Sequence, residues 1–84
     1  MDERHVRPLS MVGAGETVRV VKVNAGRGLN TRLAAMGLAS NTEVTVVSNT
    51  HPGPFVVNVK GSKVMLGRGI AHKITVGSEL EASA

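Results

Sequence analysis

The fold of this chain is decided by one stretch, Arg27-Gly28-Leu29-Asn30-Thr31-Arg32-Leu33-Ala34-Ala35-Met36-Gly37-Leu38. Leu29, Leu33 and Met36 recur at helical spacing and therefore share one face. We expect Leu33 and Met36 to cover the core, with Leu29 only partly buried one turn earlier. Gly37 supplies the left-handed residue that ends many helices, and Leu38 is the apolar residue that folds back on the last turn. The stretch predicts one short helix with a firm C-terminal stop.

Short valine-rich runs lie on both sides of this helix. They predict five strands, over residues 17–24, 42–48, 55–60, 63–66 and 73–76. Val18 and Val20 alternate in one phase, whereas Val21 and Val23 alternate in the other. A change of phase inside one strand predicts a β-bulge or a strong bend.

The number and length of these strands predict the fold class. An open sheet of five short antiparallel strands would leave long unpaired edges, so we expect a mainly β, SH3-like barrel with one α-helix between the first two strands. Gly61-Ser62 is the expected two-residue turn of a tight hairpin. We expect a flexible arm over residues 1–6, the barrel domain over residues 7–77 and a disordered tail over residues 78–84.

Composition excludes several classes of function. The 84 residues include ten Lys and Arg and six Asp and Glu, which give the chain a formal net charge of +4. The chain has no Cys and a single aromatic residue, Phe55. A base-stacking nucleic-acid platform and a groove for proline-rich peptides both need several aromatic side chains. Without Cys there is no disulfide and no thiolate metal site. We expect a cytoplasmic protein with no membrane insertion, because no apolar run approaches the ~18 residues of a membrane helix.

The chain offers few residues for metal or catalytic chemistry. The candidate metal ligands are His51 and His72, but no pair of histidines has the spacing that defines a metal site in advance. Exposed surface histidines are the plain alternative. The serines lie at predicted turns and strand ends, where backbone reasons explain them. We therefore expect no enzyme, no catalytic residue and no required cofactor.

The helix carries the candidate partner-binding residues, Arg27, Leu29 and Arg32. A partly exposed leucine beside two outward arginines suits an acidic partner, since arginine and apolar anchors dominate the energetics of interfaces. A solvated helix face is the alternative interpretation. The loop of residues 51–54 is a second candidate, because loops on a rigid scaffold often carry recognition. A stiff connector is the alternative there.

The helix and its surroundings also carry a family resemblance. Arg32-Leu33-Ala34-Ala35-Met36-Gly37-Leu38, followed after a turn by Glu43-Val44-Thr45-Val46, is similar to the core signature of FeoA domains. Residues 15–20, 54–61 and 71–76 resemble further strand segments of that family, so the match covers roughly residues 7–76. Ala14-Gly15 and Ser40-Asn41 depart from it, since they stand where the family usually has Pro-Gly.

The resemblance implies a function as well as an SH3-like fold. FeoA proteins are small cytosolic accessories of bacterial ferrous iron uptake, thought to bind the FeoB membrane transporter at its GTP-binding cytosolic region. The chain would then reach the inner membrane only through this partner. No nucleic-acid partner is expected. Two alternatives stay open. One is a metal-binding or metal-sensing domain related to the C-terminal domain of DtxR-type regulators, with weak Fe²⁺ binding. The other is a basic small-barrel nucleic-acid-binding module.

Overall fold

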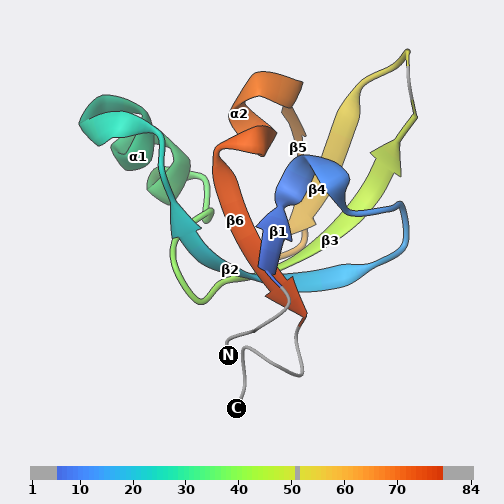
Figure 1. Cartoon of the computed structure of the whole chain (residues 1–84), viewed down its shortest axis with the longest axis horizontal. Coiled ribbons are helices and arrows are strands. Elements are labelled where there is room, and N and C mark those ends of the chain that lie inside the picture. The colour runs from blue at the N-terminus through green and yellow to red at the C-terminus, as the bar shows by residue number, and fades with distance from the viewer. Residues whose placement is uncertain (1–5, 51, 79–84) are drawn as a thin grey trace.

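Figure 1 shows a computed structural model of the chain, which describes residues 6–50 and 52–78. The elements in chain order are β1 (Val6–Pro8), the 3-10 helix η1 (Leu9–Met11), β2 (Thr17–Val23), α1 (Gly26–Ala35), β3 (Glu43–Asn49), β4 (Phe55–Val59), β5 (Ser62–Leu66), α2 (Arg68–His72) and β6 (Ile74–Ser78). Of the predicted arm (residues 1–6) and tail (residues 78–84), only Val6 and Ser78 are described, and both lie in strands. The rest lies outside the described residues. No described helix is long and apolar enough to span a bilayer.

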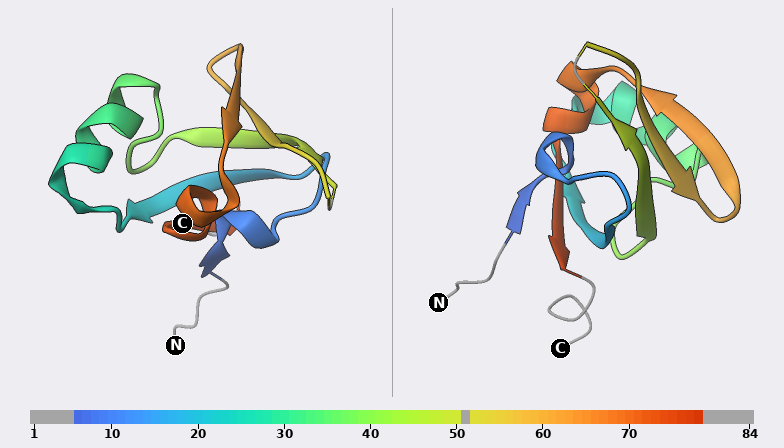
Figure 2. Two further views of the ribbon diagram at one scale, coloured as in Figure 1. Left: turned by 90° about the horizontal axis from the view of Figure 1, so that it is seen from above. Right: turned by 90° about the vertical axis from the view of Figure 1, so that its right-hand side faces the viewer.

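All six strands belong to one antiparallel sheet in the order β1-β6-β2-β3-β4-β5. The sheet curls around its core, with α1 standing to one side (Figure 1 and Figure 2). This architecture confirms the predicted mainly β, SH3-like barrel and the helix between its first two predicted strands. β1 is an additional strand, paired with β6 from Val6↔Gly77 to Pro8↔Thr75. Its three residues are too few to show a period in the sequence.

Two bulges bend the sheet. The register between β2 and β6 shifts between Val20 and Lys22, which confirms the bulge predicted from the valine phases. Val21 is exposed at this point, and the shift lets Val23 pack against the core again. A second shift in β3, between Val46 and Ser48, lies opposite β4. Because bulges increase local twist, they supply the corners that a small barrel needs.

The β4–β5 hairpin turns one residue earlier than predicted. Its two central residues are Lys60 and Gly61, with φ of +53° and +84°, and Ser62 already pairs with Val59. Positive φ at both positions defines the turn type whose twist matches the strands. The prediction of Gly61-Ser62 was wrong because a lysine rarely adopts this conformation.

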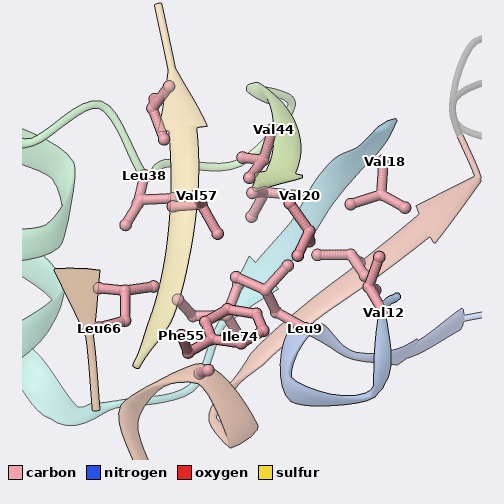
Figure 3. Close-up of a cluster of buried hydrophobic side chains, with 14 of the residues drawn as sticks. Leu9, Val12, Val18, Val20, Leu38, Val44, Phe55, Val57, Leu66 and Ile74 are labelled. Carbon is pink, nitrogen blue, oxygen red and sulfur yellow. The ribbon is translucent and has the colours of Figure 1, made fainter. Parts of the chain in front are cut away.

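The core is almost entirely aliphatic (Figure 3). Its buried residues are Leu9, Val12, Val18, Val20, Leu33, Leu38, Val44, Val46, Phe55, Val57, Val59, Leu66, Ala71, Ile74 and Val76. Leu33 is 1% exposed, but Met36 is 43% exposed, so the prediction that both are core residues was wrong for Met36. α1 ends at Ala35, so Met36 is the C-cap residue. The chain then turns at Gly37, and Leu38 enters the core instead.

Candidate functional site

The C-terminal end of α1 is firmly fixed. The Leu38 N–H donates to the Leu33 carbonyl at 2.8 Å, and the Gly37 N–H donates to the Ala34 carbonyl at 2.9 Å. These are the two hydrogen bonds of the Schellman motif. Gly37 has a φ of +95°, and a Cβ built there would lie 2.9 Å from Val59 Cγ1. The predicted helix stop is therefore confirmed, and β4 packs directly against it.

The N-terminal end of α1 is weakly stabilised by comparison. The N-cap residue Ala25 offers no capping side chain, and the first turn contains no acidic residue. Gly28 lies in this turn at a helical position, where glycine costs about 1 kcal/mol relative to alanine. Asn30 compensates in part, because its Oδ1 accepts a hydrogen bond from the Ala25 N–H at 3.1 Å. The helix is thus attached mainly through its C-terminal half.

The three predicted partner-binding residues all lie on α1. Arg27 and Arg32 are exposed, and Leu29 is half-buried against the core. At about 100° of rotation per residue, Arg32 lies on the side of Leu29, whereas Arg27 lies on the side of Asn30 and Ala34. The two arginines therefore do not form one continuous patch.

A groove opens on the Arg27 side of α1, between the helix and the end of β2. It has a volume of about 190 Å³ and is lined by Val23, Asn30, Ala34, Leu38, Ala39 and Ser40. Sequence reasoning missed this groove, because Val23, Leu38 and Ser40 come together only in the folded chain. The one sequence signal that could have indicated the groove is Ala34, a small residue on the same helix face as Asn30.

The described part of the chain carries a large excess of basic residues. Nine of the ten Lys and Arg residues, all except Arg4, lie in the described ranges, whereas Glu16 and Glu43 are the only acidic residues there. Glu16 is paired with Arg7 at 2.8 Å and accepts the Gly13 N–H. The hydrogen bond from Arg7, with a smaller contribution from Gly13, lowers the pKa of Glu16 below its ordinary value. The described barrel thus presents a strongly basic surface.

The candidate metal ligands do not come together in the described part of the chain. His51 lies outside the described residues. His72 is exposed at the end of α2, with its Nδ1 3.3 Å from Ser10 Oγ. Within residues 6–50 and 52–78, no group of three His, Cys, Asp or Glu side chains is arranged to hold a metal ion.

The loop after β3, the second candidate binding segment, is clamped by Arg68. One guanidinium nitrogen donates to Asn49 Oδ1 at 2.5 Å, and the other donates to the carbonyls of Thr50 and Gly53 at 2.5 and 3.4 Å. The guanidinium carbon also lies 5.8 Å from the centroid of the Phe55 ring. Arg68 therefore connects the start of α2 to both sides of this loop.

Asn49 extends the clamp to the N-terminal segment. Its Nδ2 donates to the carbonyls of Ser10 and Val12, at 3.2 and 2.7 Å. One side chain thus satisfies two backbone acceptors next to η1 and accepts the hydrogen bond of Arg68. Such a network favours the stiff-connector interpretation of the loop.

Comparison with known proteins places this geometry in context. The FeoA domain model matches residues 7–77. "Putative Fe(2+) transport protein A" of Methanocaldococcus jannaschii is 41% identical over 69 residues, which cover 82% of this chain and 83% of the relative.

Solved structures agree in fold. A crystal structure named iron uptake regulatory protein (FeoA) superposes with a TM-score of 0.80 at 30% identity, covering 86% of this chain and 96% of that one. The FeoA protein from Chlorobium tepidum gives a TM-score of 0.76 at 30% identity, covering 84% and 69%. A manganese-dependent transcriptional repressor gives 0.78 at 22% identity, covering 93% of this chain and 44% of the repressor. At that identity the likeness concerns the fold alone.

Proposed function

The chain belongs to the FeoA family, and on that premise we propose that it serves as an accessory protein of ferrous iron uptake. The resemblance predicted from the helix and its flanking strands is thereby confirmed. The observation that carries the proposal is the family match over residues 7–77, and a relative named for Fe(2+) transport supports it. The protein acts by binding rather than by catalysis.

The proposed partner is an FeoB-type membrane transporter, contacted at its GTP-binding cytosolic region. The binding surface is α1, where Arg27 and Arg32 are exposed and Leu29 is half-buried. A basic barrel meets an acidic partner surface at an increased association rate, because complementary charges steer the encounter. The protein then works in the cytoplasm and reaches the inner membrane through this partner.

Interferometry tests this proposal with the full transporter and with its isolated GTP-binding region. We expect wild type to bind and Arg32→Glu to bind on the order of tenfold more weakly, because the substitution reverses the charge that would face an acidic partner surface. Lys63→Glu on β5 is the matched control, since it makes the same charge change away from α1. Leu29→Asp is interpreted only where circular dichroism shows an intact fold. Absence of wild-type binding to either form of the transporter overturns the proposal.

A direct role in holding iron is tested separately. We expect anaerobic calorimetry with Fe²⁺ to show no micromolar site, because exposed His72 lies beside a serine hydroxyl rather than a second metal ligand. The control is His72→Ala. Micromolar binding that this substitution removes would instead support the metal-sensing alternative.

A further inference from the structure

The groove beside α1 has the dimensions of a single side chain. Its volume of about 190 Å³ lies below the ~300 Å³ at which sites for small molecules begin. Three of its lining residues, Ala34, Ala39 and Ser40, are small, and they leave the space that larger side chains would fill. Buried Leu38 and half-buried Val23 supply further apolar walls. The groove is therefore suited to one aliphatic side chain.

Two polar groups fix the orientation of an occupant. Asn30 Oδ1 is engaged by the Ala25 N–H, so its amide nitrogen is directed away from that bond. Within the described residues, neither this nitrogen nor Ser40 Oγ forms a hydrogen bond. Both can donate to a carbonyl or carboxylate oxygen of a bound segment.

Charge selects among occupants. Arg27 shares the helix face of Asn30 and Ala34, and residues 17–42 contain no Asp or Glu. Contact between the described parts of two copies is disfavoured, because both are basic. We therefore take an acidic segment of a different protein as the occupant, and self-association is an outcome of the test below.

We propose that this groove is an anchor pocket for one aliphatic side chain of an acidic partner segment. The side chain packs between Ala34 and Val23, and flanking carboxylates face Arg27 and the Asn30 amide. This deepens the proposed function and rests on it, since the segment would belong to the cytosolic part of the transporter.

Filling the pocket tests the proposal. Ala34→Leu places a side chain in the groove from an exposed position, whereas Ala35→Leu adds the same side chain at an exposed neighbour outside the lining. The probe is a short fluorescent peptide with a central leucine flanked by glutamates, measured by anisotropy. We expect Ala34→Leu to weaken binding on the order of tenfold, and Ala35→Leu to leave it within about twofold. Replacing the leucine of the peptide by serine should have the same effect as Ala34→Leu.

Three outcomes overturn the proposal. The first is equal peptide binding by Ala34→Leu and Ala35→Leu, and the second is no peptide binding by wild type. The third is a concentration-dependent dimer in sedimentation that Ala34→Leu abolishes, because it would assign the groove to a second copy.

The same variants measured against the transporter separate the pocket proposal from the proposed function. If Ala34→Leu leaves transporter binding unchanged, the pocket proposal fails but the proposed function stands. If the peptide binds in a pocket-dependent way and the transporter does not bind, the proposed function fails but the pocket proposal stands.

Discussion

Gly37 shows how one residue can join a helix to a barrel. Its φ of +95° lies in the left-handed region, and a Cβ there would come within 2.9 Å of Val59 Cγ1. Alanine therefore meets both backbone strain and a clash with a buried side chain of β4. The same residue ends the helix and sets how closely it approaches β4.

The first prediction concerns this position. Gly37→Ala should lower the free energy of unfolding by about 2–4 kcal/mol, since left-handed strain and overpacking each cost about 1–2 kcal/mol. Urea denaturation measures the change. Gly67→Ala is the control, because Gly67 has a φ of −70° and no neighbouring atom within 4 Å of a Cβ. Equal stability of the two variants would contradict this account.

Arg68 is a second residue whose side chain joins distant segments. Arg68→Ala should cost about 1–3 kcal/mol of stability in urea denaturation, because hydrogen bonds from a charged donor to Asn49 and to two loop carbonyls are lost. Arg68→Lys should recover less than half, since an ammonium cannot reproduce the planar fork. The control is Arg32→Ala at an exposed position, expected within about 0.5 kcal/mol of wild type. Full recovery by lysine would mean that charge alone explains the clamp.

At the scale of elements, α1 is held by few buried contacts of its own. It spans ten residues, and Leu33 is the only fully buried one. Isolated helices shorter than ~12 residues are marginal in water, so most of its stability comes from packing and from its C-cap. A helix fixed at one end opens from the other, which places Arg27 in the more dynamic half.

Two glycines in this half provide a matched pair. Gly28→Ala should stabilise α1 by about 0.5–1 kcal/mol, because Gly28 is helical with open space around a Cβ. Gly26→Ala should destabilise it by about 1 kcal/mol, since Gly26 has a φ of +83°. Amide hydrogen exchange across residues 27–33 measures both, with slower exchange expected for the first variant and faster for the second. The same change in both variants would contradict the assignment of φ at these positions.

At the scale of the whole molecule, the dominant property is a basic surface without an exposed aromatic residue. Phe55, the single aromatic residue of the sequence, is 1% exposed and packs in the core. A surface of this kind attracts phosphates through charge but cannot stack bases, so its nucleic-acid binding should depend strongly on salt.

This property gives the last prediction. In gel shifts with random RNA or DNA, we expect only weak binding that disappears near about 0.15 M salt. Bovine albumin, an acidic protein, serves as a control for nonspecific behaviour of the assay. Tight binding that persists at that salt concentration would favour the nucleic-acid alternative over a protein partner.

The sequence by itself determined the features that arise from neighbours along the chain. Helical spacing, the Gly37-Leu38 stop and the phase change in β2 each depend on a few consecutive residues, so local physics specifies them. The same local blocks carried the family resemblance. The exposed arginines and the half-buried Leu29 also followed from helix periodicity.

Tertiary structure decided whatever depends on residues far apart in the chain. β1 exists because β6 provides its pairing partner, and Lys60 adopts a positive φ because the twist of two strands requires it. The groove beside α1 forms only when Val23 and Ser40 meet the same helix face. The sequence around each of these residues does not predict these contacts, because each contact is stabilised by a partner that only folding brings close.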